Sequence, residues 1–249
     1  MVKILLNGCL GKMGQAVEAC INSRDDVTIA AGVDIADGRR DYPIHTCFMD
    51  VIEEVDVIID FSNPLVLEDM LSYAVEHETP IILCTTGLSD VQIQKVKDAA
   101  ALIPIFYSGN MSLGINVLIE LSKMAARVLS GSFDIEILEK HHNLKLDAPS
   151  GTAIMIADAI SEEKADAQYV YDRHSYLKKR DKNEIGIHSV RGGTIVGEHE
   201  VIFAGHDEVL SITHTAQSKG VFAAGAVNAA VFIKDKPAGL YDMGDLLRE

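Results

Sequence analysis

The sequence contains few cysteines and no long hydrophobic segment. The cysteines form no C-x-x-C pair and have no regular spacing, which argues against a disulfide framework and predicts reduced thiols. They are Cys9, Cys20, Cys47 and Cys84. The longest apolar runs, 55–61 and 223–233, are too short or too interrupted to span a bilayer. Because Val2–Leu6 lead directly into a glycine loop, we expect no signal peptide and a cytoplasmic protein.

Positive charge is also scarce. The chain has 22 Lys and Arg residues against 37 Asp and Glu residues, a formal net charge of −15. This balance argues against binding to nucleic acid or to an anionic membrane surface. An acidic protein that binds an anion must therefore concentrate its few cationic side chains in one place.

What remains is ordinary globular composition, with 48% hydrophobic and 24% charged residues. A chain of 249 residues can bury a large core and is long enough for one large domain or two modest ones.

The N-terminal residues follow the order of a dinucleotide-binding unit. An apolar strand over 2–7 leads into Gly8-x-x-Gly11-x-x-Gly14, a helical pattern follows, and a second strand over 27–33 ends at Asp34. Glycines allow a tight turn and a close approach of the backbone to a pyrophosphate. Asp34 comes about twenty residues further on, where a carboxylate can accept hydrogen bonds from the ribose hydroxyls of NAD. Strand, glycine loop, helix and acid together predict dinucleotide binding.

The cofactor residues expected here are those of the loop and the acid after the second strand: Gly8, Cys9, Leu10, Gly11, Lys12, Met13 and Asp34. The spacing departs from G-x-G-x-x-G because Leu10 occupies the second glycine position. Asp34 favours NAD slightly, whereas Arg39 and Arg40 could neutralise the 2′-phosphate of NADP. The choice between NADH and NADPH therefore stays open.

Strands and helices continue to alternate up to about residue 112. Buried strands are expected over 55–61, 80–83 and 103–106, and helices between them, one opened by the capping box Ser89-x-x-Gln92. Ligands gather beyond the carboxyl ends of the strands in an open parallel sheet. Further cofactor contacts are therefore expected from Cys84, Thr85, Thr86, Ser108, Gly109, Asn110 and Met111.

Cationic and titratable side chains concentrate in the middle of the chain. His141, His142 and Lys145 are followed by Asp-Ala-Pro-Ser-Gly-Thr over 147–152 and by an apolar helix over 153–160. The first N–H groups of a helix attract an anion, so a carboxylate between this helix start and the cations would be held from both sides. The segment predicts an anion site beside a proton donor. Alternatively, the histidines are surface residues and the turn is only a helix cap; a metal site is disfavoured because neighbouring side chains diverge.

The second half of the chain has a different pattern. A long amphipathic helix over 114–128 and an alternating strand over 133–139 precede the central segment, and a charged stretch over 161–183 follows it. Alternating strands within 190–203 and 209–215 predict an antiparallel or mixed sheet with one packed face. An alanine-rich helix over 221–233 is expected to pack back on the first domain.

Five motifs of the sequence occur in the same order as in one known family. They are Gly8-x-x-Gly11-x-Met13-Gly14, Cys84-Thr85-Thr86-Gly87, Asn110-x-Ser112-x-Gly114, Glu139-x-His141-His142-x-x-Lys145-x-Asp147-Ala148-Pro149-Ser150-Gly151-Thr152-Ala153 and Arg191-x-Gly193-x-x-x-Gly197-Glu198-His199. The chain resembles the dihydrodipicolinate reductases, also called 4-hydroxy-tetrahydrodipicolinate reductases, over nearly its whole length. The string from His141 to Ala153 is far more specific than the glycine loop.

The resemblance implies a fold and an activity. It implies an α/β fold, with a Rossmann-type doubly wound parallel sheet (1–112 and 219–249) and a second α+β domain for substrate binding and oligomerisation (113–218) inserted before the C-terminal helix. It implies NADH- or NADPH-dependent reduction of a cyclic imine dicarboxylate in diaminopimelate and lysine biosynthesis, by a homotetramer. His141 would be the acid/base residue and Lys145 the proton donor. The substrate-binding residues would be His142, Ser150, Gly151 and Thr152.

Two positions depart from the family pattern, and two other functions stay open. Cys84 replaces the usual glycine before Thr-Thr-Gly, and Lys219 replaces a frequent arginine, which changes a fork of donors into a point charge. One alternative is a Rossmann reductase acting on a semialdehyde, which would need a catalytic cysteine near the site. The other is a non-catalytic NAD-binding regulator, which would be free to lose His141 and Lys145.

Overall fold

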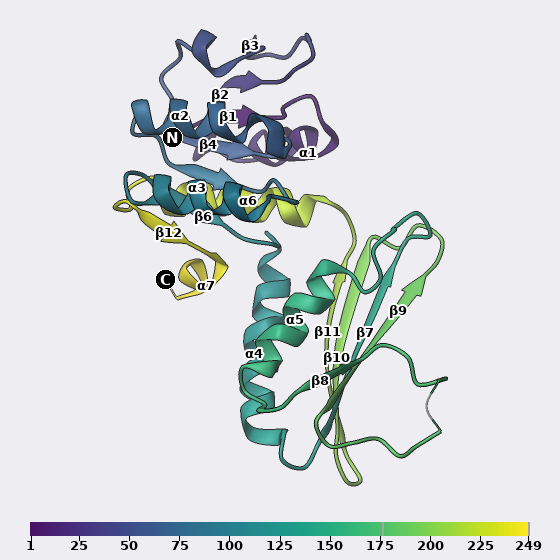
Figure 1. Cartoon of the computed structure of the whole chain (residues 1–249). Coiled ribbons are helices and arrows are strands. Elements are labelled where there is room, and N and C mark those ends of the chain that lie inside the picture. The colour runs from purple at the N-terminus through teal and green to yellow at the C-terminus, as the bar shows by residue number, and fades with distance from the viewer. Residues whose placement is uncertain (176, 249) are drawn as a thin grey trace. The chain divides into compact units, whose positions relative to one another are not determined.

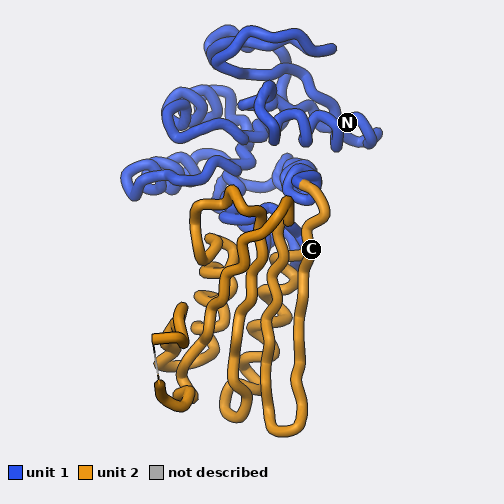
Figure 2. Tube along the Cα trace, turned by 90° about the vertical axis from the view of Figure 1, so that its right-hand side faces the viewer, with its two compact units in different colours: residues 1–113, 219–249 blue, residues 114–218 orange. Residues whose placement is uncertain are grey.

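The computed structural model describes residues 1–175 and 177–248 and divides into two compact units. The first unit comprises Met1–Leu113 and Lys219–Glu249, and the second comprises Gly114–Ser218 (Figure 2). The second unit is therefore an insertion into the first. No helix among the described residues is long and apolar enough to cross a membrane.

The first unit is built on a seven-stranded parallel sheet (Figure 1). Its spatial order is β12-β6-β5-β4-β1-β2-β3, and every neighbouring pair is parallel. The strands are β1 (Val2–Asn7), β2 (Val27–Val33), β3 (Ile44–His45), β4 (Val57–Asp60), β5 (Ile81–Leu83), β6 (Pro104–Tyr107) and β12 (Gly239–Tyr241). Because all strands are parallel, their carboxyl ends form one edge, where β1 and β4 are neighbours although β2 and β3 come between them in the chain.

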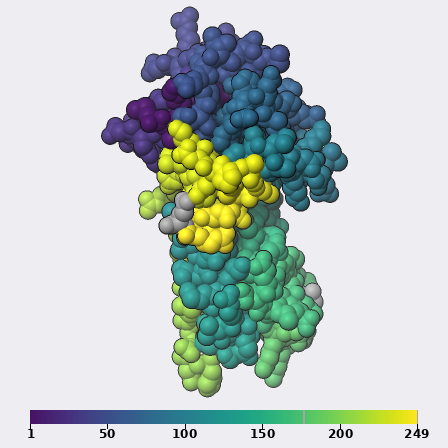
Figure 3. All heavy atoms as spheres, turned by 90° about the vertical axis from the view of Figure 1, so that its left-hand side faces the viewer, coloured from purple at the N-terminus to yellow at the C-terminus, as the bar shows by residue number. Residues whose placement is uncertain are grey.

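Helices cover both faces of this sheet, because alternate residues of a buried strand point to opposite faces. Ile4 and Leu6 of β1 pack in the core with α1 (Lys12–Ile21) and α6 (Gly220–Ile233), while Leu5 packs with α2 (Leu67–Glu76) and α3 (Asp90–Ala100). Two 3₁₀ turns, η1 (Phe48–Asp50) and η2 (Pro64–Val66), and the short α7 (Met243–Leu247) complete the unit. The C-terminal residues, yellow in Figure 3, lie against the blue residues of the same unit. The doubly wound α/β prediction is confirmed.

The second unit is a five-stranded mixed sheet with two helices on one face. Its order is β11-β10-β7-β9-β8, with β10 antiparallel to β7 and β11, and β9 parallel to β7 and β8. The strands are β7 (Asp134–His141), β8 (Gln168–Val170), β9 (Glu184–Arg191), β10 (Gly197–Ala204) and β11 (Val209–Ala216). The helices α4 (Leu113–Leu129) and α5 (Gly151–Ser161) share one apolar core with this sheet.

Several sequence expectations need adjustment. The strand expected over 133–139 extends to His141, so this histidine lies on β7. The segment 190–203 comprises the end of β9, a turn at Gly192-Gly193 and most of β10. The charged stretch over 161–183 contains β8, and β12 and α7 follow the helix that was expected to be the last element. The Ser89–Gln92 capping box is present as expected.

Candidate active site

The glycine loop of the first unit packs tightly against the sheet. Gly8 has φ +77°, and a Cβ there would lie 2.7 Å from the carbonyl oxygen of Phe61. A Cβ at Gly14 would lie 2.3 Å from the carbonyl oxygen of Gly8, so α1 can start directly over the loop only with glycine there. Gly11 occupies the N-cap of α1 and has no side chain to cap its first N–H groups. N–H groups at a helix start of this kind can bind the phosphates of a dinucleotide.

Asp34 is bound to this loop. Its Oδ2 accepts a hydrogen bond from the backbone N–H of Leu10 at 2.9 Å, and its Oδ1 accepts one from Ala36 at 3.2 Å. Each carboxylate oxygen keeps a further lone pair for a ribose hydroxyl. Asp34 also lines a cavity of about 260 Å³ together with Gly8, Gly11, Ser62 and Asp69.

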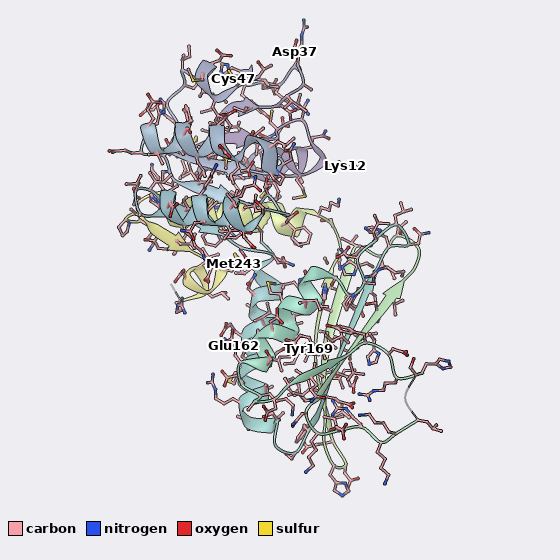
Figure 4. The ribbon with its side chains drawn as sticks, viewed as in Figure 1. Lys12, Asp37, Cys47, Glu162, Tyr169 and Met243 are labelled. Carbon is pink, nitrogen blue, oxygen red and sulfur yellow. The ribbon has the colours of Figure 1, made fainter. Side chains whose placement is uncertain are left out.

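The two arginines considered for a 2′-phosphate differ in environment. Arg40 is half-buried, and its Nε lies 3.0 Å from Oε2 of Glu18. Arg39 is exposed, and neither arginine lines the 260 Å³ cavity. Lys12 stands at the start of α1, and Asp37 lies in the loop after β2 (Figure 4). The cavity wall therefore presents two carboxylates, Asp34 and Asp69.

Other expected cofactor residues reach the sheet edge in different ways. The side chain of Cys9 is fully buried in the core, where burial raises its pKa to about 11, so only its backbone can face a ligand. Thr86 and Gly109 are exposed, whereas Thr85, Asn110 and Met111 are buried. The Ser108 hydroxyl donates to the carbonyl of Asn110 at 3.0 Å.

A buried carboxylate that the sequence analysis did not single out lies at the same edge. Asp60 ends β4 and is 1% exposed; its Oδ1 accepts hydrogen bonds from Asn7 at 2.8 Å and from the Ser62 hydroxyl at 2.5 Å. Burial raises the pKa of Asp60, although these hydrogen bonds oppose the shift. Burial and the charge of Asp60 together hold the pKa of the Cys84 thiol well above its usual value. Cys84 is therefore a packed thiol beside a buried acid.

In the second unit, polar residues replace the apolar core at one end of β7. Alternate residues Ile135, Ile137, Glu139 and His141 are all buried on the helix-covered face. Glu139 pairs in register with Ser189 on β9 and with His199 on β10, and His199 pairs with His214 on β11. One row of the sheet is thus polar from β9 to β11.

Glu139 is the centre of this polar region. It is 0% exposed and makes a bidentate ion pair with Arg191, in which both N–O distances are 2.7 Å. Its Oε2 lies 2.5 Å from Nδ1 of His141, and its Oε1 accepts the backbone N–H of Ser150 at 3.1 Å. Burial alone would raise the pKa of Glu139, but the hydrogen bonds, led by those of Arg191, hold it at about 2. The carboxylate is ionised at any working pH.

Two histidines lie together beside it. The rings of His141 and His199 meet edge to face, with centroids 5.2 Å apart. Burial lowers the pKa of His141, and Glu139 opposes that shift. Burial, with the added charge of His141, lowers the pKa of His199 to about 4. Nε2 of His199 lies 3.0 Å from the Ser150 hydroxyl, which also caps α5 by accepting the N–H of Ala153 at 3.1 Å.

Lys145 and the start of α5 hold an internal carboxylate. Nζ of Lys145 lies 2.9 Å from Oδ1 of Asp147, and this bond, with those from the backbone N–H groups of Asp147 and Gly151, lowers the pKa of Asp147. Asp147 thus occupies the position between helix start and cation that was expected for a ligand carboxylate. Nδ1 of His142 is buried and has no hydrogen-bond partner within the described part of the chain, which suits a ligand contact.

The chain matches two models of one family. The model described as the N-terminus of dihydrodipicolinate reductase matches residues 2–111, and the model of its C-terminus matches residues 114–247. The chain belongs to the dihydrodipicolinate reductase family. It is therefore an NAD(P)H-dependent oxidoreductase, and the family resemblance found in the sequence is confirmed.

Individual relatives are similar to this chain over its full length. The 4-hydroxy-tetrahydrodipicolinate reductase of Caldanaerobacter subterraneus subsp. tengcongensis is 50% identical over 250 residues, which covers 100% of this chain and 99% of the relative. The enzyme of the same name from Clostridium tetani is 47% identical and covers 99% and 97%. A solved structure of dipicolinate-bound dihydrodipicolinate reductase from Paenisporosarcina sp. TG-14 has a TM-score of 0.83 at 22% identity, covers 97% of each chain and shows the same fold.

The structure brings the predicted residues of this reductase together in two groups. In the first unit, the glycine loop, Asp34 and the ends of β4 to β6 share one sheet edge. In the second unit, His141, Lys145 and Ser150 surround Glu139 and Asp147. Glu139, Arg191 and His199 lie in quoted motifs but had no role assigned, because their contacts depend on a cross-strand register that the sequence does not display. Within 1–175 and 177–248, no group of three or more His, Cys, Asp or Glu is arranged to hold a metal ion.

Proposed function

We propose that this chain reduces 4-hydroxy-tetrahydrodipicolinate, or its dehydrated form, to tetrahydrodipicolinate with NADH or NADPH, and that His141 and Lys145 carry the proton chemistry. This step belongs to diaminopimelate and lysine biosynthesis. The observation that supports the residue roles is the fixed His141, bound to the buried Glu139 at 2.5 Å, beside a lysine and a helix start that already hold a carboxylate.

The second unit suits a cyclic imine that carries two carboxylates. Lys145 and the N–H of Gly151 would bind one substrate carboxylate in place of Asp147. Ser150 fixes the start of α5, and His142 and Thr152 lie on either side of this turn. The buried Nδ1 of His142, which has no hydrogen-bond partner among the described residues, and the carboxylate of Asp147 beside Lys145 support this assignment.

The first unit suits the cofactor, because its glycine loop leaves the space that a Cβ would fill and its cavity contains Asp34. When bound, NAD(P)H supplies a hydride to the conjugated ring. Negative charge then builds on the ring nitrogen, so a nearby cation and proton donor lower the barrier. Lys145 would supply charge and a proton, and His141 would exchange a proton near neutral pH.

The test is steady-state oxidation of NADH and NADPH, with substrate generated in situ by the preceding synthase. We expect wild type to turn over, and His141→Gln and Lys145→Met to lose about 100-fold or more of kcat while still binding NADH. Wild type that binds NADH but oxidises none of it would refute the proposed function. Variants that retain full kcat would refute only the residue assignment.

We extend the proposal to a cytoplasmic homotetramer assembled through the second unit. Its sheet is covered by α4 and α5 on one face, while side chains of the other face remain partly exposed, including Val190 at 42% and Val209 at 65%. A sheet with one covered face has a second face available for packing against another sheet. The mass in solution by light scattering tests the assembly.

A further inference from the structure

We infer that Glu139 is a positioning residue that fixes the tautomer of His141, so that Nε2 is the atom that exchanges the proton. The inference deepens the proposed function and rests on the role that it gives to His141. Glu139 itself touches neither substrate nor cofactor in this scheme and acts only through the imidazole.

The first step is the protonation state of Glu139. An ionised carboxylate accepts hydrogen bonds and cannot donate one. Both oxygens already accept from Arg191, and Oε1 also accepts from the backbone of Ser150. Nδ1 of His141 lies 2.5 Å from Oε2, so Nδ1 must carry the hydrogen of that contact. Nε2 is then the nitrogen that gains or loses a proton.

The second step is the space around Nε2. In the register of β10 against β7, Gly197 comes opposite His141. A Cβ at Gly197 would lie 3.2 Å from Nε2 of His141. That distance is shorter than most Cβ contacts, so any larger residue at position 197 would press on this atom. The missing side chain keeps the titrating nitrogen open, while Glu139 holds the opposite nitrogen.

The third step is the charge around the ring. Groups facing His141 are Glu139 on its own strand, Arg191 on β9, His199 on β10 and Lys145 before α5. Glu139 raises the pKa of His141, whereas burial, Lys145 and Arg191 lower it. Without the carboxylate of Glu139, only influences that lower the pKa of His141 remain. The charge of Glu139 therefore keeps the pKa of His141 higher than it would be without this carboxylate.

The kinetic test is Glu139→Gln in the full-length enzyme. We expect kcat to fall at least about tenfold with the KM for NADH unchanged, since the amide no longer dictates the tautomer. The limb of the kcat–pH profile that reports His141 should move to lower pH. A profile that coincides with that of wild type would overturn the inference.

Glu136→Gln is the matched control. Glu136 lies on the same strand and contacts His188 at 2.8 Å, Arg180 at 3.0 Å and Arg173 at 3.1 Å, on the face away from α5. Like Glu139→Gln, the Glu136→Gln substitution removes a carboxylate that binds a histidine and arginine. We expect its kcat and pH profile to match those of wild type; an equal loss in both variants would indicate a general effect of charge removal and contradict the specific role of Glu139.

A spectroscopic test needs no destabilising variant. In wild type labelled with ¹⁵N-histidine, above the pKa of His141, we expect the His141 signal to show a protonated Nδ1 and an unprotonated Nε2, with assignment by comparison to His141→Gln. The opposite tautomer would overturn the inference even if Glu139→Gln fails to fold. This measurement does not require turnover, so its failure is distinct from failure of the proposed function.

Discussion

We expect Asp34 to contribute to cofactor choice through both its charge and its position. Its two oxygens are each bound to one backbone N–H, which fixes the carboxylate at the cavity wall. A 2′-phosphate placed there would meet two carboxylates, Asp34 and Asp69, while Arg40 is committed to Glu18. At the scale of single residues, we therefore expect the first unit to favour NADH.

We predict that Asp34→Asn raises kcat/KM for NADPH relative to NADH by about tenfold, which corresponds to roughly 1.4 kcal/mol. The amide keeps an oxygen for the N–H of Leu10 but loses the charge that repels a phosphate. The ratio of the two kcat/KM values measures the effect. Asp37→Asn, a change at an exposed position of the same loop (Figure 4), should leave the ratio unchanged. An equal change in both variants would mean that only net charge matters.

Helix α5 connects fold and site at the scale of elements. The hydroxyl of its N-cap residue, Ser150, accepts the N–H of Ala153 and also contacts His199. The backbone N–H of Ser150 donates to Glu139. The helix start, the polar row of the sheet and the fixed His141 are thus one hydrogen-bonded assembly. A change at the cap should act on stability and on the site together.

We predict that Ser150→Ala lowers the free energy of unfolding by about 1–2 kcal/mol and also lowers kcat/KM. The cap is lost and Nε2 of His199 loses its partner. Ser89→Ala is the comparison, because Ser89 caps α3 by accepting the N–H of Gln92 at 3.3 Å. It should cost about 1 kcal/mol without affecting kcat/KM. Urea unfolding and steady-state kinetics separate the two; unchanged activity in Ser150→Ala would contradict the link between cap and site.

Elements with strong local signals could be predicted from the sequence, and elements defined by distant partners could not. Strands β1 and β2 were predicted with their observed bounds, and the α3 capping box was recognised, because glycines, caps and apolar periods are local. β8 and β12 each have three residues and exist through pairing with β9 and β6. Asp60 and the role of Glu139 could not be predicted either, because their hydrogen-bond partners come from other strands.

The pH dependence of stability belongs to the whole molecule. His199 is 4% exposed, and burial with the charge of His141 lowers its pKa from 6.5 to about 4. The unfolded chain therefore binds a proton on this group below pH 6.5, while the folded chain binds it only below about 4. The stability contributed by the neutral ring is present above pH 6.5 and is lost as pH falls to 4. Glu139 adds a further loss only between pH 4.5 and about 2.

We predict that the free energy of unfolding falls less between pH 6.5 and 4 in His199→Gln than in wild type. The difference should be roughly 3 kcal/mol at most. Glutamine has no group that titrates in this range and can still contact Ser150. Urea unfolding at half-unit steps of pH measures the slope. His206→Gln is the control, because the side chain of His206 is 98% exposed. If wild type and His199→Gln have the same slope, the buried histidine is not its source.

The insertion of one unit into the other sets an order of events on the ribosome. Helix α6 supplies Ala226, Val227, Ala230 and neighbouring residues to the core beside α1, yet it is synthesised only after the whole second unit. At about 5–20 residues per second, the first unit waits roughly 5–25 s with one face of its sheet covered only in part, by α1. The core of the second unit comes entirely from residues 115–212. The later part of the sequence can thus complete its core first, and the nascent first unit is the part whose apolar surface stays exposed for longer.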